Sequence, residues 1–477
     1  AAVVGLLLVG VSGRYGYHRD ELYFLAAGDH PAFGYVDQPP LVPLLARAMD
    51  AIGGGSLVVL RLPSAVAAAL TVFFTGLIAQ RLGASRRGQL LASACMGAGA
   101  VTYAVGHLMS TSAFDLLGWA VLTYLLVRAV EEDGRIWLLA GLVAGVGLQV
   151  KVLMAFLLLG LTVGVLVAGP RGIVRSRWLW AGAGIAAVLW APNLAWQAAN
   201  GWPQLELADA IANGGSATSE PRWAYLPFQL VLVSPFLFPV WMAGWWALLR
   251  SPQLRTWRFL AVGYVVLAAV FLATGGKPYY QAGLYPALLA AGAEPVLRWV
   301  ERGRRRLRRG VLAGALGTAA ASSAFLFLPL VPAGQLHATP VVAVNSDAGE
   351  TVGWPRFADT VAGVVEANTR DGEHPAVLTR NYGEAGALLR YHPDIADVHS
   401  GHNSFWDWGP PRAGTGVVVA VGFPAGRLEE WFDHVEPAGA VDNGLHVDNE
   451  EQGTPIWVCS GPRRPWIELW PDMRRLG

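Results

Sequence analysis

Two adjacent carboxylates, Asp20 and Glu21, stand in the stretch YGYHRDELYF, between an apolar start and a proline-rich loop. A carboxylate near a membrane boundary is costly unless it is paired or used, so this pair points to chemistry. Asp20 could act as a general base or as an electrostatic stabiliser. It could equally be the N-cap of a short helix, ELYFLAAG, and the two roles are compatible.

A second acid, Asp115, lies in GHLMSTSAFDLLGWA at the start of an apolar run, with His107 close by in the sequence. An N-cap is again the structural alternative. If that run spans a membrane, Asp115 stands at its extracytoplasmic end, which is also the side argued below for Asp20. Two carboxylates on one side allow a shared acid–base site.

The chain holds only two lysines, Lys151 and Lys277, among its 35 basic residues, and both lie at the ends of apolar runs. Lysine side chains in such places can simply extend to the membrane interface. Lysine also binds phosphate as a point charge. Together with Arg61 in VVLRLPSAV, these residues would supply two or three cations for a phosphate headgroup. Tyr279 and Tyr280, which follow Lys277, could cover a sugar or an isoprenoid.

The elements that must position these residues are apolar helices. Only 14% of the residues are charged, 54% are hydrophobic and the mean hydropathy is +0.40, whereas a soluble protein carries about 25% charged residues. Runs long enough for a transmembrane helix predict about eleven spans, near 1–13, 57–80, 88–106, 114–130, 136–150, 152–169, 178–196, 224–249, 258–274, 281–299 and 311–331. Two of these spans, in the region 136–169, require the chain to turn around Lys151.

Arginine-rich loops alternate with the other loops, and the positive-inside rule makes their side cytoplasmic. The N-terminus is then cytoplasmic, and the loop 14–56, both lysines and everything after about 332 are extracytoplasmic. The arginine-rich loops are 81–87, 169–177, 250–258 and 298–309.

The segment 333–477 has a different pattern. Short apolar stretches (PVVAVN, PAVLTR and GVVVAVGF) alternate with helix-like segments (WPRFADTVAGVVEAN and GEAGALLRY). This pattern predicts a soluble α/β extracytoplasmic domain of usual size. It follows a polytopic α-helical membrane domain, 1–332, whose first outer loop, 14–56, is expected to hold interfacial helices.

Other features exclude several classes of protein. The net charge of +1 gives no reason to expect nucleic-acid binding, and the chain has no Walker A motif and no usable G-x-S-x-G. Cys95 and Cys459 are not expected to form a disulfide. We expect no cofactor: Glu21 and a histidine could bind a divalent cation, but no metal-binding spacing supports one. No cleavable signal peptide is evident, and the apolar start without Met suggests that a few residues are missing.

Several of these motifs together resemble the GT-C glycosyltransferases. They are the acidic DE of the first loop, the PP-containing stretch after it, RLPSA in the second span and the Asp that opens the fourth. The resemblance is greatest to family 39, the group of protein O-mannosyltransferases and lipid A aminoarabinose transferases. KPYYQAGLYPAL and GLQVK resemble its late outer loop and its lysine segment. NYGEAGALLRY (381–391) and SGHNSFWDWGP (400–410) look like the outer domain of bacterial members.

The resemblance implies an inverting transferase that uses a polyprenyl-phosphate sugar on the extracytoplasmic side of a bacterial inner membrane. The acceptor would be a glycan, lipid or protein of the cell envelope. The matching positions are Asp20, Glu21 and Asp115 as catalytic acids, Lys151, Lys277 and Arg61 at the donor phosphate, and His18, His107, Tyr279 and Tyr280 in the donor and acceptor pocket.

Two other functions are open to this sequence. A transporter or flippase for a lipid-linked sugar would often show paired repeats and broken helices at mid-membrane. We find no repeat, and the polar residues gather on one side, and both observations favour the enzyme over a transporter. A glycan sensor with a membrane anchor would not need about eleven spans.

Overall fold

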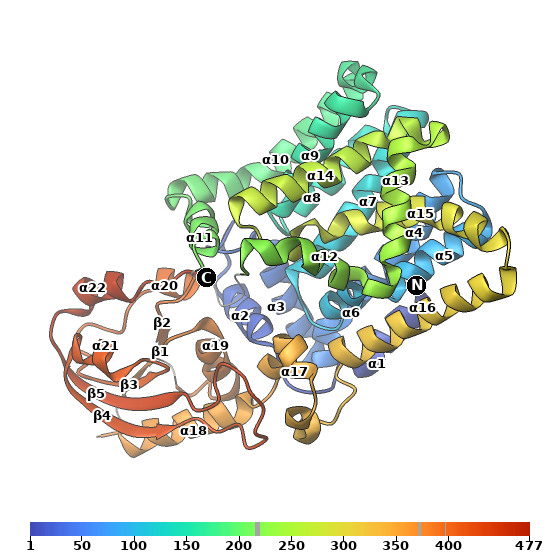
Figure 1. Ribbon diagram of the computed structural model, residues 1–477. Coiled ribbons are helices and arrows are strands. Elements are labelled where there is room, and N and C mark those ends of the chain that lie inside the picture. The colour runs from blue at the N-terminus through green and yellow to red at the C-terminus, as the bar shows by residue number, and fades with distance from the viewer. Residues whose placement is uncertain (215–219, 371–373, 396) are drawn as a thin grey trace. The chain divides into compact units, whose positions relative to one another are not determined.

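The computed structural model describes residues 1–214, 220–370, 374–395 and 397–477, which divide into two compact units (Figure 1). Unit 1 comprises Ala1–Ser12, Gln38–Val42 and Arg61–Leu328. Unit 2 comprises Gly13–Asp37, Pro43–Leu60 and Pro329–Gly477. Most of the first predicted outer loop therefore packs with the C-terminal part of the chain. The division after Leu328 lies close to the predicted boundary at 332.

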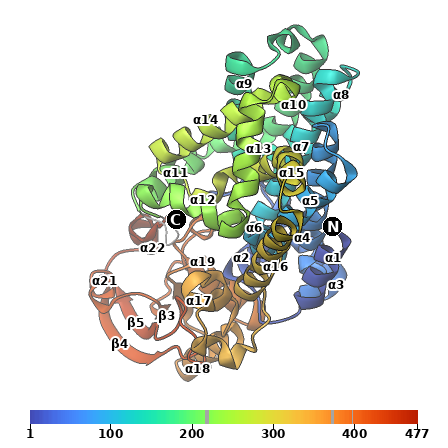
Figure 2. The ribbon, with the colours of Figure 1, turned by 45° about the vertical axis from the view of Figure 1, so that its right-hand side comes forward.

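Unit 1 is built from helices (Figures 1 and 2). Its α-helices are α1 (Ala2–Val11), α4 (Leu57–Arg81, whose first residues belong to unit 2), α5 (Arg86–Gly97), α6 (Ala100–Gly106), α7 (Thr111–Glu131), α8 (Ile136–Leu148), α9 (Leu153–Ala168), α10 (Arg177–Ala199), α11 (Pro203–Ala212), α12 (Tyr225–Val233), α13 (Phe238–Arg250), α14 (Arg258–Thr274), α15 (Tyr285–Glu301) and α16 (Arg305–Phe327). Its 3-10 helices are η1 (Arg171–Arg175), η2 (Arg222–Ala224), η3 (Pro235–Leu237), η4 (Pro252–Trp257) and η5 (Pro278–Leu284).

The predicted number of eleven spans is not confirmed. Within the described residues, five helices are long and apolar enough to cross a membrane, or up to seven if each of two bent pairs counts as one span. The run 88–106 breaks into α5 and α6, bent by 57°, and the run 224–249 breaks near Pro235 with a bend of 82°. Three further apolar helices, α1, α8 and α9, are shorter. The predicted turn at Lys151 is confirmed, because α8 ends at Leu148 and α9 begins at Leu153.

Glycines let the helices of unit 1 approach backbone to backbone. A Cβ at Gly244 of α13 would lie 1.8 Å from the Leu288 carbonyl oxygen of α15, and one at Gly141 of α8 would lie 2.1 Å from the Gly182 oxygen of α10. A Cβ at Gly164 of α9 would lie 2.3 Å from a carbonyl oxygen of α14. Small residues at such contacts are how helices associate where apolar burial supplies little driving force.

Unit 2 combines short helices with one sheet (Figure 1). Its helices are α2 (Arg19–Asp29), α3 (Leu41–Gly53, whose first two residues belong to unit 1), η6 (Ala333–Ala338), α17 (Val341–Val344), η7 (Ser346–Thr351), α18 (Trp354–Ala367), α19 (Tyr382–Tyr391), α20 (Ser404–Asp407), α21 (Ala425–Glu429), α22 (Trp466–Leu469) and η8 (Trp470–Met473). Its strands are β1 (Ala376–Thr379), β2 (Val398–Ser400), β3 (Val417–Val421), β4 (Phe432–Ala440) and β5 (Pro455–Pro462).

The described strands form a mixed sheet in the order β2-β1-β3-β5-β4. Strands β2, β1 and β3 are parallel, whereas β5 is antiparallel to both β3 and β4. Every residue of β1 is buried, as expected for a central parallel strand covered on both faces. Leu378, Ala420 and Cys459 belong to one core cluster with several tryptophans. Cys95 and Cys459 are both buried and free, which confirms the prediction that they form no disulfide.

Four of the segments expected from the pattern of 333–477 form strands or helices, and one expectation is corrected. PAVLTR and GVVVAVGF contain β1 and β3, and the two helix-like segments form α18 and α19. PVVAVN was expected to be a strand, but it forms the short helix α17. Val341 of α17 packs in a cluster with Leu336, Val352 and Val447. This cluster buries the Val341 side chain without any pairing to a sheet.

Candidate functional site

The predicted site residues divide between the two units. His18, Asp20 and Glu21 belong to unit 2. The other predicted residues belong to unit 1, namely Arg61, His107, Asp115, Lys151, Lys277, Tyr279 and Tyr280.

Asp20 is not the N-cap of its helix, contrary to the capping alternative. Helix α2 begins at Arg19 with His18 as N-cap, so the predicted start was two residues late. The Asp20 N–H donates to His18 Nδ1 at 3.2 Å, and the His18 N–H donates to Glu21 Oε2 at 2.8 Å. This is a capping box, in which the third helical residue reaches back to the cap. The box gives the fully buried Glu21 a structural role and leaves capping to residues other than Asp20.

The Asp20 carboxylate receives a hydrogen bond from a residue far along the chain. The Tyr382 hydroxyl donates to Asp20 Oδ1 at 2.8 Å. Burial, and then the Asp20 charge, raise the pKa of Tyr382 well above its ordinary value, so the tyrosine stays a donor. The His402 ring lies 4.7 Å from the Tyr382 ring, and burial lowers the pKa of His402 to about 3, which keeps it neutral.

Acidic side chains from η7 and the β4–β5 connection surround Arg19. Its guanidinium lies 2.8 Å from a Glu450 oxygen and 3.9 Å from a Glu350 oxygen. Glu451 accepts a hydrogen bond from the Asn381 amide at 3.3 Å. Burial raises the pKa of Glu350 despite the Arg19 charge, and burial with the neighbouring acids raises that of Glu451 well above its ordinary value. Arg19, the residue before Asp20 in the sequence, is thus paired with Glu450 and lies near Glu350.

The first loop is also tied to the 400–410 motif within unit 2. The Tyr23 hydroxyl donates to Asp37 Oδ1 at 2.8 Å, and the Ser404 N–H donates to the Tyr23 oxygen at 3.3 Å. The Val36 N–H donates to Ser404 Oγ at 2.9 Å. These bonds connect Tyr23 of α2 and the segment after the helix to Ser404.

In unit 1, Lys151 collects several of the predicted residues. Its ammonium donates to Ser112 Oγ at 2.9 Å and lies 5.2 Å from the Tyr279 ring and 5.8 Å from the Tyr280 ring. Its charge also acts on Asp115. The structure therefore places the lysine beside the two tyrosines and close enough to Asp115 for the two charges to interact.

Asp115 is likewise not an N-cap. Helix α7 begins at Thr111, and its cap is Ser110, whose Oγ accepts the Ala113 N–H. Asp115 lies one turn further in, is 7% exposed, and accepts a hydrogen bond from the Trp119 indole N–H at 3.0 Å. Its carboxylate is thus oriented by its own helix.

The remaining predicted residues have other surroundings. Arg61 is 1% exposed and donates to the Ser12 carbonyl oxygen at 2.7 Å, at the end of α1. His107 is buried and its Nδ1 lies 2.8 Å from the Tyr103 oxygen, at the end of α6. Lys277 is the residue before η5, which carries the two tyrosines beside Lys151. Phosphate contacts by Arg61 and Lys277 stay predictions.

No group of three or more His, Cys, Asp or Glu side chains that could hold a metal ion occurs among residues 1–214, 220–370, 374–395 and 397–477.

The sequence prediction missed Tyr382 as a partner of Asp20. The motif NYGEAGALLRY was singled out without a role, because hydrogen bonding across 362 positions leaves no local pattern. The capping box could have been recognised from the spacing of His18 and Glu21, although histidine is not among the preferred caps.

Two comparisons of sequence point to one kind of protein. Residues 37–196 match the family described as dolichyl-phosphate-mannose-protein mannosyltransferase. The chain is also 26% identical over 348 residues to the undecaprenyl phosphate-alpha-4-amino-4-deoxy-L-arabinose arabinosyl transferase 1 of Pseudomonas fluorescens (strain Pf0-1). That match covers 66% of this chain and 58% of the relative, so it spans less than two thirds of the relative's length.

Solved structures match over nearly the whole chain. The crystal structure of ArnT from Cupriavidus metallidurans bound to undecaprenyl phosphate matches with a TM-score of 0.63 at 15% identity, over 96% of this chain and 97% of that one. The cryo-EM structure of the arabinofuranosyltransferase AftD from Mycobacteria matches with a TM-score of 0.54 at 13% identity, over 97% of this chain and 40% of that one. At such identities the likeness is one of fold.

Proposed function

We propose that this chain is a membrane glycosyltransferase of the GT-C type. The proposal is supported by the match of residues 37–196 to the mannosyltransferase family, by the similarity to the arabinosyl transferase of Pseudomonas fluorescens and by the likeness in fold to ArnT. It moves a sugar, hexose or pentose, from a polyprenyl phosphate to an acceptor hydroxyl of the cell envelope. The observation in this chain that carries the proposal is the setting of Lys151, a lysine ammonium held by a hydroxyl and two tyrosine rings beside an acid.

The chemistry follows from the residue types. The acceptor oxygen attacks the anomeric carbon while the bond between that carbon and the phosphate oxygen breaks. Asp20 takes the acceptor proton as general base. Lys151 and Lys277 bind the phosphate and offset the charge that grows on it as it leaves. A single displacement inverts the anomeric centre. Asp115 sets the electrostatics around Lys151.

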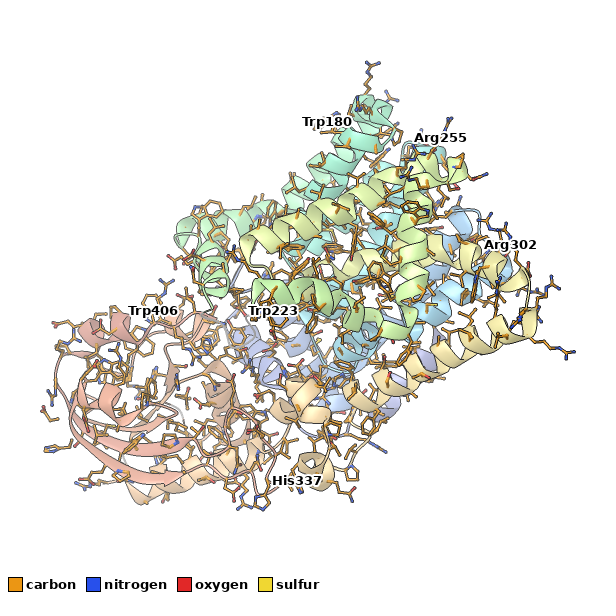
Figure 3. The ribbon with its side chains drawn as sticks, viewed as in Figure 1. Trp180, Trp223, Arg255, Arg302, His337 and Trp406 are labelled. Atoms are coloured by element: carbon orange, nitrogen blue, oxygen red, sulfur yellow. The ribbon has the colours of Figure 1, made fainter. Side chains whose placement is uncertain are left out.

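We place the reaction on the extracytoplasmic side of a bacterial inner membrane, with the N-terminus cytoplasmic. The positive-inside rule supports this orientation. In Figure 3 the labelled Arg255 lies at the upper right of unit 1 and Arg302 at its right edge, whereas Trp223 lies towards its lower left. This arrangement is the one expected if the arginine-rich loops share one side.

Transfer in detergent distinguishes an enzyme from a flippase. The purified full-length chain is mixed with undecaprenyl phosphate carrying radiolabelled mannose or 4-amino-4-deoxy-L-arabinose, and with an envelope fraction as acceptor. We expect covalent label in the acceptor. Transport alone cannot produce this label because it forms no bond between sugar and acceptor. Lipid-linked sugar that crosses proteoliposome membranes without any covalent product would contradict the proposal and favour the flippase.

A further inference from the structure

Helices α2 and α19 of unit 2 pack so closely that two glycines of α19 leave no room for a side chain. A Cβ at Gly383 would lie 2.7 Å from Arg19 Cβ, and one at Gly386 would lie 2.9 Å from Leu22 Cβ. Real Cβ atoms essentially never come so near. The glycines therefore let the start of α19 lie against the first turn of α2, which is where Tyr382 makes its contacts.

The Tyr382 ring is held by several neighbours. Its centroid lies 4.8 Å from that of Tyr23 and 4.7 Å from that of His402. The Arg19 guanidinium lies 5.8 Å from the ring centroid. Aromatic and cation–π contacts of this kind favour one position of the ring. The side chain is 8% exposed, so its hydroxyl has one well-defined position, at Asp20.

The charged neighbour of Asp20 is paired with other acids. Arg19 lies 2.8 Å from a Glu450 oxygen and 3.9 Å from a Glu350 oxygen. A neutral hydroxyl, that of Tyr382, donates to Asp20 Oδ1 at 2.8 Å, and a directional hydrogen bond of this length orients the carboxylate.

We propose that Tyr382 is a positioning residue for the Asp20 base. Its hydroxyl holds Oδ1, so the carboxylate keeps one orientation toward the acceptor hydroxyl. The inference rests on the proposed function and extends it, because it gives the NYGEAGALLRY motif of the C-terminal segment a part in the reaction.

Tyr382→Phe tests the inference, since it removes the hydroxyl and keeps the ring contacts. With the full-length protein and radiolabelled undecaprenyl-phosphate sugar, we expect kcat to fall about tenfold to a hundredfold with the donor KM within about twofold, because misplacing a catalytic group costs rate. Tyr15→Phe is the matched control. It removes a tyrosine hydroxyl that donates to the Val331 carbonyl oxygen at 2.6 Å in the same unit, and is expected to keep the wild-type rate.

A double-mutant cycle separates positioning from a general structural effect. Tyr382→Phe should add no further loss to Asp20→Asn, because the hydroxyl then has no base to orient. If the two losses multiply in full, or if Tyr382→Phe transfers at the wild-type rate while Asp20→Asn is slow, the positioning inference is overturned and the proposed function stands. If Asp20→Asn itself transfers normally, the assignment of the base fails instead. Unchanged affinity for undecaprenyl phosphate checks that each variant is folded.

Discussion

Glu384 is expected to contribute to a pH dependence of the stability of unit 2, and one substitution can remove that contribution. The side chain is 2% exposed, and its Oε2 accepts the Arg380 N–H at 2.8 Å and the Asn381 N–H at 3.0 Å. Burial raises its pKa from 4.5 to about 7, although these hydrogen bonds pull the value down. Glu384 also completes the capping box of α19, the helix that carries Tyr382.

The sign of the effect follows from proton linkage. The folded state holds this proton more tightly than the unfolded state, so the stabilising contribution is complete below pH 4.5 and is lost as the pH rises through about 7. At about 1.4 kcal/mol for each pKa unit, the loss is about 3 kcal/mol. The pKa values of Glu350 and Glu451 are raised in the same direction, so they add to the trend.

Glu384→Gln keeps the side-chain length and an acceptor oxygen but does not titrate. Thermal unfolding of the full-length protein between pH 5 and pH 8 should show the variant gaining stability relative to wild type as the pH rises. A difference of about 3 kcal/mol corresponds to a relative gain in Tm of about 6–12 °C for a unit of this size. Exposed Glu366 on α18 provides the control, and Glu366→Gln is expected to follow the wild-type curve. A constant Tm offset between Glu384→Gln and wild type across this range would refute the reasoning.

Two further predictions concern unit 1. Lys151→Met should weaken binding of undecaprenyl phosphate about tenfold to a hundredfold, the usual worth of one charge-assisted contact, whereas the exposed Arg175→Met should leave the Kd unchanged. Equal Kd values for the two variants would remove Lys151 from the phosphate site. Gly244→Ala should destabilise the protein by about 1–3 kcal/mol or more, because its Cβ would meet backbone atoms that cannot move aside. Gly314→Ala, with nothing within 4 Å of its Cβ, should be neutral or stabilising, and equal melting temperatures for the two alanine variants would contradict the packing.

Local sequence patterns predicted several strands and helices of unit 2 that the structure contains. Period-two and period-3.6 apolar patterns identified β1, β3, α18 and α19, because each buries one side or both against a core. A four-residue apolar stretch fits a helix as well as a strand, and α17 is the case where that ambiguity gave the wrong answer. The span number is not confirmed for a related reason. Apolar length alone does not reveal a bend such as the one near Pro235.

The expectation that Lys151 and its neighbours lie on one side of the membrane comes from a pattern along the chain. The alternation of arginine-rich and other loops predicts this sidedness, and it stays a prediction. The partner of Asp20 has no such signal, because it depends on the close packing of α2 and α19 at Gly383 and Gly386. Both N-cap alternatives were wrong because His18 and Ser110 take that position.

Sugar transfer by the Asp20→Asn protein is the most direct measurement of whether Asp20 is the catalytic base. The substitution keeps the shape of the side chain and its acceptor oxygen for Tyr382, and removes the ability to take a proton at neutral pH. We predict that kcat falls about 10²- to 10⁴-fold, the usual contribution of a general base, while affinity for undecaprenyl phosphate stays at the wild-type value. Transfer by Asp20→Asn at the wild-type rate, from the same radiolabelled donor to the same envelope acceptor, would contradict the assignment of Asp20 as the catalytic base.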